Sequence, residues 1–267
     1  MRRITIILVC LICHIGYGQS AKKISGNLLE MPKITAQDNV IIYTGFTVSY
    51  NTSTLIPNWV AYELTATEVE GQYPRKGQFG QDFSFRGRQA MREDYSNSGW
   101  DKGHMCPAAD LKWSEKTMYE SFYLTNICPQ NHELNSKDWL TLEKLAREWA
   151  RKFDRVYIIC GPIIDENVYG KIGPQGVVVP DAFFKAFLTV KDNVFNTIAF
   201  VMPNGPERHK VQDYAMSVND LELLIGLDLF TSVDDRYEEI VESDLYFRYW
   251  GVIKDGCERN NQYYSRA

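Results

Sequence analysis

Five apolar residues recur at spacings of three and four in the segment that opens at Asn135. They are Trp139, Leu142, Ala146, Trp149 and Phe153. This period places all five on one face of a helix, and an apolar face of that length must be buried against another element. The chain must therefore supply a sheet or a further helix that covers this face.

Runs rich in β-branched and aromatic residues provide the covering sheet. They are Trp59–Leu64, Ser121–Cys128, Val156–Cys160, Gly176–Val179, Phe183–Val190 and Asn193–Met202, and Gly, Pro, Asn or Asp residues separate them. Such runs predict strands, and Pro129 is expected to end the second of them. A later helix is predicted over Val218–Ile225, with Ser217 as N-cap and Gly226 just past its end. The order favours an α+β fold with a largely antiparallel sheet flanked by helices.

The first eighteen residues have the pattern of an export signal. Two arginines precede an apolar run from Ile4 to Ile15, and small residues follow at Gly16 and Gly18. The run is shorter than the ~20 residues that cross a bilayer, which argues against a membrane anchor. The expected organisation is a signal peptide at 1–18, an N-terminal arm at 19–45 and one domain at 46–267. The expected location is secreted or periplasmic, without membrane attachment after cleavage.

Charge and cysteine content constrain the mature chain. Removal of residues 1–18 leaves 27 basic and 34 acidic residues, a net charge of −7. A protein that binds nucleic acid without sequence preference usually presents a basic face, so any such face here must be local. Four cysteines remain, namely Cys106, Cys128, Cys160 and Cys257. In an oxidising compartment they could form two disulfides, with three connectivities open.

The most informative stretch runs from Asp101 to Ala109 and reads Asp-Lys-Gly-His-Met-Cys-Pro-Ala-Ala. A neutral imidazole is the usual base that takes a proton from water near pH 7, so His104 is a candidate general base. Taken alone, His104 is better explained by a structural role than by catalysis. His132 and His209 are interpreted as surface or loop residues.

The stretch resembles the signature of the DNA/RNA non-specific endonuclease family, Asp-Arg-Gly-His followed by an apolar and then small residues. Lys102 stands where that signature has arginine. Further segments resemble the family in the expected order: Phe122–Asn126, Pro129-Gln130, Leu134-Asn135, Trp139, Leu142-Glu143, Gly161-Pro162 and Val201–Asn204. The resemblance covers roughly Trp59 to Phe230. It implies a ββα-metal motif, also called a His-Me finger, within the α+β fold.

The resemblance assigns metal-related roles to two residues on the predicted helix. Asn135 is implied as the sole direct protein ligand of one Mg²⁺, a hard ion that keeps several waters and that Mn²⁺ could replace. From the residue alone, an N-cap is the better explanation of Asn135. Glu143 is implied to hydrogen-bond the water of the ion. It lies ~12 Å further along an ideal helix and ~80° around it, and a solvated helix charge is the alternative.

Three more residues complete the implied site. Arg75, in a long Gly- and Arg-rich loop between Glu70 and Trp100, resembles the phosphate-binding arginine of the family. Lys102 supplies positive charge but lacks the planar fork with which arginine grips two phosphate oxygens. Asn126 is expected to orient the His104 region through hydrogen bonds, with a strand-end cap as the alternative.

The implied activity is metal-dependent hydrolysis of phosphodiester bonds in DNA and RNA with little sequence preference, leaving 5′-phosphate ends. Two alternatives stay open, namely a nucleic-acid-binding protein without catalysis and a phosphodiesterase for small substrates. The presence of His104, Asn135 and Glu143 together favours catalysis. Oligomeric state and any inhibitor protein are left open by the sequence.

Overall fold

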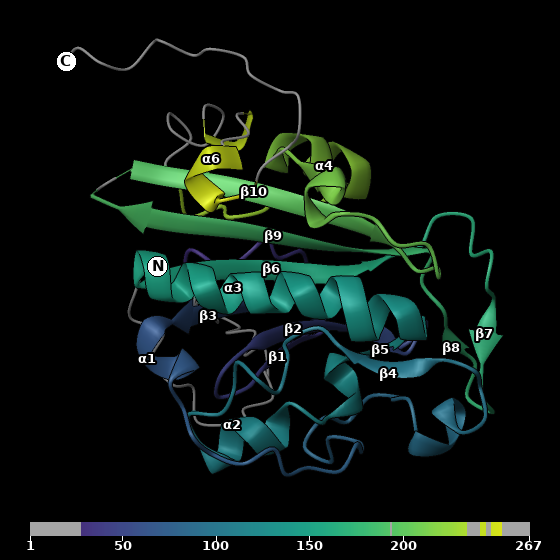
Figure 1. Cartoon of the computed structure of the whole chain (residues 1–267). Helices are drawn as coiled ribbons and strands as arrows, with labels where there is room; N and C mark the ends of the chain where they lie inside the picture. The colour runs from purple at the N-terminus through teal and green to yellow at the C-terminus, as the bar shows by residue number, and fades with distance from the viewer. Residues whose placement is uncertain (1–27, 193, 234–240, 244–246, 253–267) are drawn as a thin grey trace, which may run out of the picture.

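A seven-stranded antiparallel sheet forms the centre of the computed structural model, which describes residues 28–192, 194–233, 241–243 and 247–252 (Figure 1). Its strand order is β1-β2-β3-β6-β9-β10-β11. The strands are β1 (Val40–Ile42), β2 (Thr47–Asn51), β3 (Ile56–Thr65), β6 (Arg155–Ile163), β9 (Ala182–Lys191), β10 (Val194–Pro203) and β11 (Ala215–Met216). The predicted strands at Trp59–Leu64, Val156–Cys160 and Phe183–Val190 all lie within it. The α+β class with a largely antiparallel sheet is confirmed.

Both faces of the sheet are covered, because successive side chains of a strand point to opposite sides. On β3, Val60, Tyr62 and Leu64 join the core under α3 (Leu140–Phe153). Trp59 and Ala61 join a second core beneath α4 (Val218–Ile225). Figure 1 shows α3 lying across the sheet beside β6. The sheet is therefore the middle layer between two helical coverings.

The two predicted helices form with the faces that the sequence requires. All five residues of the apolar stripe from Trp139 to Phe153 are buried. Ser217 Oγ accepts from the backbone N–H of Asp220 at 3.1 Å, and Gly226 ends α4 with a positive φ of 65°. A left-handed residue is typical of this position, and glycine adopts it without the strain of a side chain.

A π-helical turn, η3 (Leu134–Trp139), precedes α3 and was not predicted. The helical segment already begins at His132, and Asn131 Oδ1 accepts from the backbone N–H of Glu133 at 2.9 Å. Asn131 thus makes the capping contact, and the N-cap alternative for Asn135 is wrong. The ~80° estimate for Glu143 assumed regular α-helix and does not apply across a π turn, whose hydrogen bonds span five residues.

A separate two-stranded ladder lies before α3. It pairs β4 (Asp101–His104) with β5 (Ile127–Gln130), so that His104 faces Ile127 and Asp101 faces Gln130. Two strands followed by a helix make the ββα arrangement that the resemblance implied. At Gly103, an added Cβ would lie 2.0 Å from Gln130 Oε1, so the close approach of the strands requires glycine there.

The segment before α3 differs from the strand predicted for it. Ser121–Cys128 is not one strand: its middle forms a 3₁₀ turn, η2 (Leu124–Asn126), and Pro129 lies within β5. A two-stranded ladder tolerates proline because each strand has an unpaired edge. The shorter elements are α1 (Ala66–Val69), η1 (Arg92–Tyr95), α2 (Glu115–Glu120), β7 (Lys171–Ile172), β8 (Val177–Val178), η4 (Val211–Tyr214) and α6 (Phe247–Trp250).

Part of the predicted N-terminal arm belongs to the sheet. Val40–Ile42, inside the predicted arm, is the edge strand β1 and belongs to the sheet. The predicted signal peptide at 1–18 and Cys257 lie outside the described residues. Within the described residues, no helix has the length and apolarity that a membrane span needs.

The two disulfides that the cysteine count allowed are not present. Cys106, Cys128 and Cys160 are buried and free. Two bridges among four cysteines would join at least two of these three, whatever the partner of Cys257. The Cys160 thiol lies 3.3 Å from the carbonyl oxygen of Met105, so it serves as a buried donor.

Candidate active site

His104 lies at the end of β4 and its ring is held between two aromatic side chains. The centroids of Phe79 and Phe122 each lie 5.3 Å from its own. The residue is 8% exposed, and its Nε2 has no hydrogen-bond partner among the described residues. A buried polar atom without a partner costs free energy, so its retention points to a use outside the folded chain itself.

The environment keeps this imidazole neutral. Burial lowers the pKa of His104 to about 3, and the positive charge of Arg75 acts in the same direction. A neutral imidazole carries one nitrogen with a free lone pair. Near neutral pH the ring is therefore unprotonated and keeps that lone pair free for a hydrogen bond from a bound molecule.

The backbone on either side of His104 is fixed by side chains from other elements. Trp139 Nε1 donates to the carbonyl oxygen of His104 at 3.2 Å. The Asn126 amide donates to the carbonyl oxygen of Cys106 at 2.9 Å and accepts from its backbone N–H at 2.9 Å. It also donates to the carbonyl oxygen of Ser121 at 3.0 Å. Asn126 is fully buried, so this clamp on the segment after His104 is shielded from water.

Asn135 projects from η3 toward β4. Its Nδ2 donates to Asp101 Oδ2 at 2.9 Å. Asp101 Oδ2 also lies 2.9 Å from Nδ1 of His132, whose side chain is 70% exposed. With its nitrogen committed to Asp101, the amide of Asn135 presents its oxygen as the atom that a ligand can reach.

Glu143 occupies the first turn of α3 and is 8% exposed. Burial raises the pKa of its carboxyl to about 7, against the opposing charge of Lys185. Asp110 raises the pKa further, whereas Arg147 and Arg75 lower it. The solvated-charge alternative for Glu143 is therefore wrong, because the side chain is buried within a group of charges.

Arg75 links the two titrating groups. It is exposed on the loop before β4, and its guanidinium carbon lies 5.8 Å from the centroid of Phe122, the ring that also contacts His104. Its charge acts on the pKa of both His104 and Glu143. The structure thus brings Arg75, His104 and Glu143 to one place, although they are far apart in sequence.

Lys102 lies two residues before His104 on β4. Its Nζ is 5.7 Å from the centroid of Phe79 and 5.4 Å from that of Tyr95. Contacts of this kind favour a cation over a neutral side chain. They hold the ammonium beside the ring that packs on His104.

Lys185, on β9, is a charged residue of this region that the sequence analysis missed. It is fully buried, its Nζ donates to the carbonyl oxygen of Met105 at 3.4 Å, and it lies 4.5 Å from the ring centroid of Trp139. A buried ammonium requires a compensating charge, which Glu143 and Asp110 provide. The sequence feature that could have indicated this residue is a lysine near aromatic residues within a predicted strand.

The donor set suits a hard divalent cation. An amide oxygen from Asn135 and the carboxylates of Asp101 and Glu143 are oxygen donors of the kind that Mg²⁺ takes. Among the described residues, no group of three or more His, Cys, Asp or Glu side chains could enclose a metal. An ion that keeps most of its water needs few protein ligands, and the amide oxygen of Asn135 is a donor suited to it.

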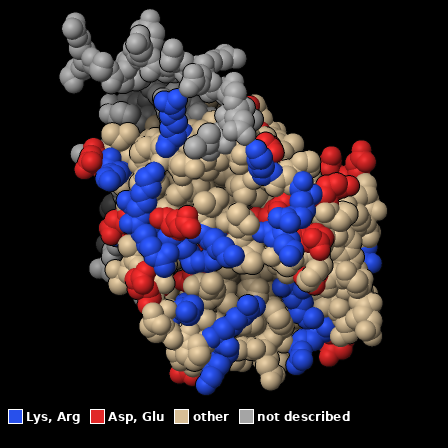
Figure 2. All heavy atoms as spheres, in the orientation of Figure 1, with Lys and Arg blue, Asp and Glu red and all other residues tan. Residues whose placement is uncertain are grey.

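Basic side chains gather on one part of the surface, although the chain as a whole has a negative net charge. In Figure 2, groups of Lys and Arg side chains lie across the middle of the face that carries α3 and below it, with Asp and Glu side chains among them. Lys144, Arg147, Arg151 and Lys152 belong to that helix. A polyanion can approach this face although the whole chain carries a net charge of −5.

Comparison with known proteins identifies the family. A family model described as DNA/RNA non-specific endonuclease matches residues 25–236, most of the chain. The chain belongs to this family. Its members are metal-dependent nucleases, so the protein is a hydrolytic endonuclease whose reaction requires a divalent metal.

Named relatives agree with the assignment. Mitochondrial nuclease EXOG of Danio rerio is 37% identical over 82% of this chain and 68% of its own length. Human mitochondrial endonuclease G is 32% identical over 68% of this chain and 66% of its own. A nuclease of Nostoc is 29% identical over 79% and 80% respectively. Against human EXOG, the chain spans only 57% of the relative.

A solved structure shares the fold. The crystal structure of an EndoG/EndoGI complex, described as explaining EndoG inhibition, superposes with a TM-score of 0.71 at 27% identity. The match covers 78% of this chain and 91% of that one. It supports the assignment of β4, β5 and the following helix as a ββα-metal motif.

The comparisons overturn the predicted location. The EXOG, endonuclease G and yeast relatives are named as mitochondrial nucleases. These names point to mitochondria rather than to secretion, and the prediction of a secreted or periplasmic protein is wrong. The location had been inferred from the length and flanking residues of the N-terminal apolar run, and these features do not by themselves identify the compartment.

Proposed function

We propose that this nuclease hydrolyses phosphodiester bonds of DNA and RNA in the presence of Mg²⁺, with little sequence preference, and leaves 5′-phosphate and 3′-hydroxyl ends. The observation that carries the proposal is the neutral, buried His104 with an unpartnered Nε2 beside Arg75. Backbone phosphates carry no sequence information, and the site residues are suited to phosphate rather than to base edges.

In the proposed reaction, Nε2 of His104 takes a proton from water, and the resulting hydroxide attacks phosphorus in line. The P–O3′ bond breaks, and the 3′ oxygen leaves and gains a proton from solvent. Arg75 and Lys102 offset negative charge on the phosphoryl group. Burial, together with the charge of Arg75, makes His104 a weak base in the free protein. A bound phosphate neutralises that arginine and raises the proton affinity of the imidazole.

The metal would be held by Asn135, with Asp101 orienting its amide and Glu143 hydrogen-bonding the water of the ion. A bound divalent cation supplies positive charge at the departing oxygen. Mn²⁺ should replace Mg²⁺, since both accept oxygen donors. The buried Glu143 would ionise more readily beside such a cation, which opposes the rise in its pKa caused by burial.

A plasmid-nicking assay tests this function directly. Supercoiled DNA and a folded RNA are incubated with the protein and Mg²⁺, with and without chelator. We expect the protein to cleave both the DNA and the RNA, and chelator to abolish this cleavage. A ligase that requires 5′-phosphates should religate the DNA products directly. His104→Ala should reduce the rate by at least ~100-fold, the usual worth of a general base. Metal-independent binding without cleavage would contradict the proposal.

A further inference from the structure

Phe83 is the most exposed of the large apolar side chains in the described residues, at 92%. It belongs to the loop that also supplies Arg75 and Phe79. The other aromatic residues of this stretch turn inward: Phe79 packs on His104, and Phe85 lies 5.7 Å from Tyr50 in an edge contact. Phe83 alone of the three points away from the core.

The backbone beneath Phe83 is held in place on both sides. The backbone N–H of Phe85 donates to the carbonyl oxygen of Asp82 at 3.2 Å, which closes a turn with Phe83 and Ser84 at its centre. Asp82 Oδ1 accepts from Ser84 N–H at 2.8 Å and from Ser84 Oγ at 2.7 Å. Gln89 donates to the carbonyl oxygen of Asp82 at 2.8 Å and accepts from its N–H at 2.9 Å.

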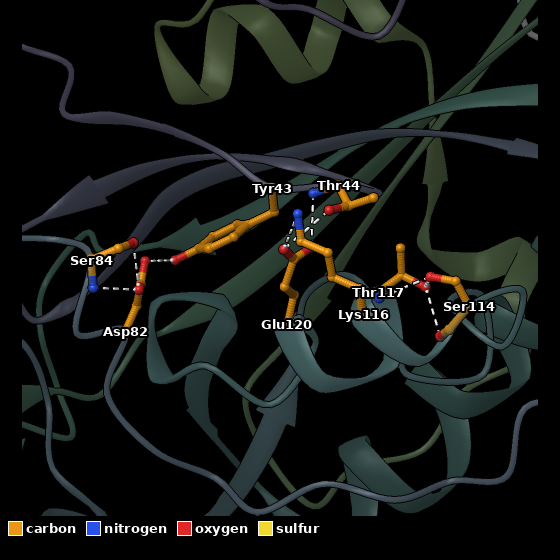
Figure 3. A network of polar contacts seen from close by, with 8 residues as sticks. All are labelled: Tyr43, Thr44, Asp82, Ser84, Ser114, Lys116, Thr117 and Glu120. Atoms are coloured by element: carbon orange, nitrogen blue, oxygen red, sulfur yellow. Dashed lines mark hydrogen bonds and ion pairs between the residues drawn. The ribbon is translucent and has the colours of Figure 1, made fainter. Parts of the chain in front are cut away.

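The turn is also tied to the region of His104. Figure 3 shows the hydroxyl of Tyr43 directed at Asp82, to which it donates at 2.9 Å. The same hydroxyl lies 2.8 Å from Thr125 Oγ1, next to the clamp residue Asn126. The backbone that carries Phe83 is thus already ordered, so little backbone conformational entropy would be lost on binding.

We infer that Phe83 stacks on an unpaired base of the nucleic-acid substrate and thereby makes single-stranded or locally opened strands the preferred ligand. The inference rests on the proposed function. Stacking on an aromatic ring needs no base-specific contact, since every base presents a π face, and it agrees with a lack of sequence preference.

Distance and charge both suit such a ligand. Phe83 follows Phe79 by four positions, so their Cα atoms are at most ~14 Å apart. Stacked nucleotides advance ~3.4 Å each along a strand, which places the ring a few nucleotides from a phosphate at His104. Lys76, Arg86 and Arg88 are exposed on the same loop, and such side chains can contact the phosphates of a bound strand.

The aromatic surface does not end at Phe83. Tyr123 lies 5.5 Å from Tyr43, whose hydroxyl holds Asp82, and Tyr119 lies 5.6 Å from Tyr123 and is 58% exposed. Aromatic rings thus continue away from the turn toward α2. Phe83 is the test residue, because it has no packing role that its removal would disturb.

The decisive experiment measures binding in chelator, where no cleavage occurs. A short single strand, the same strand with abasic sites and the matching duplex are titrated against wild type, Phe83→Ala and Phe83→Trp. Leu223→Ala is the matched control, since Leu223 is 85% exposed on α4, over the opposite core. Phe83→Ala should weaken binding of the intact strand by about 5- to 100-fold, and Phe83→Trp should retain it.

The abasic strand separates stacking from general damage. Wild type and Phe83→Ala should bind it with the same affinity, and the preference of wild type for single strand over duplex should be lost in Phe83→Ala. Equal affinity of both proteins for the intact strand overturns the role of Phe83. An equal loss on intact and abasic strands overturns stacking too. If wild type neither binds nucleic acid nor nicks plasmid with Mg²⁺, the proposed function itself fails.

Discussion

Nδ2 of Asn135 donates a hydrogen bond to Oδ2 of Asp101 at 2.9 Å. An amide has one nitrogen and one oxygen, so this bond determines which of them is offered to a ligand. Asp101 opens β4 and Asn135 lies in η3, so the contact joins the ladder to the helix of the ββα motif. The first residue of the signature thus positions the proposed metal ligand.

Asp101→Ala should weaken the response to Mg²⁺ while leaving the fold intact. Loss of a group that orients a metal ligand typically costs ~10- to 100-fold in metal affinity. Asp101→Asn retains an acceptor oxygen and should be milder. The measurement is the Mg²⁺ concentration that half-saturates plasmid nicking, with Glu148→Ala on the exposed face of α3 as control. An unchanged value in Asp101→Ala would remove this residue from the metal site.

Arg75→Gln should raise the pKa of His104. Burial is the larger cause of the depressed pKa and persists in the variant, so the pKa should rise from about 3 but stay below 6.5. NMR titration of the imidazole in metal-free protein measures the change. Lys76→Gln, which removes a neighbouring exposed charge, is the control. Identical titrations of wild type and Arg75→Gln would place Arg75 away from the imidazole.

Glu143→Gln should change how stability depends on pH. The folded pKa of about 7 lies above the ordinary 4.5, so the folded state binds this proton more tightly. The stabilisation is complete below pH ~4.5 and is lost as the pH rises through 7, with a slope of at most ~1.4 kcal/mol per pH unit. Glutamine resembles the protonated carboxyl and escapes this loss.

Chemical denaturation in chelator at pH 5 and pH 8 measures that difference. Relative to wild type, the unfolding free energy of Glu143→Gln should be higher at pH 8 than at pH 5. His104 has the opposite linkage, since its depressed pKa costs stability as the pH falls below 6.5, but it is present in both proteins. Glu148→Gln is the control, and a gap independent of pH would rule out the raised pKa of Glu143.

Lys102→Arg should hold or raise activity, whereas Lys102→Glu should lower it. Arginine retains the charge, can contact the rings of Phe79 and Tyr95, and adds a forked donor for phosphate. Glutamate would repel an incoming phosphate and the charge that develops on it. Nicking rates at fixed Mg²⁺ and salt measure both effects. Equal rates for wild type and the two variants would show that this side chain does not face the phosphate.

The layers of the fold follow from local patterns in the sequence. The stripe from Trp139 to Phe153 required a buried helix, and the β-branched runs required a sheet, because these patterns depend only on local periodicity. The ends of α4 followed from Ser217 and Gly226 for the same reason. The signature around His104 and its order relative to Asn135 and Glu143 were sufficient to indicate the family.

The contacts, burial and pKa values of the side chains of the site depend on the tertiary structure. Asn135 lies within the π turn and contacts Asp101, whereas the sequence alone favoured a capping position for it. Burial shifts the pKa values of His104 and Glu143. The buried Lys185 and the outward Phe83 depend on which face of a strand or turn meets the core. Such properties arise from neighbours distant in sequence, since desolvation and charge act through space and not along the chain.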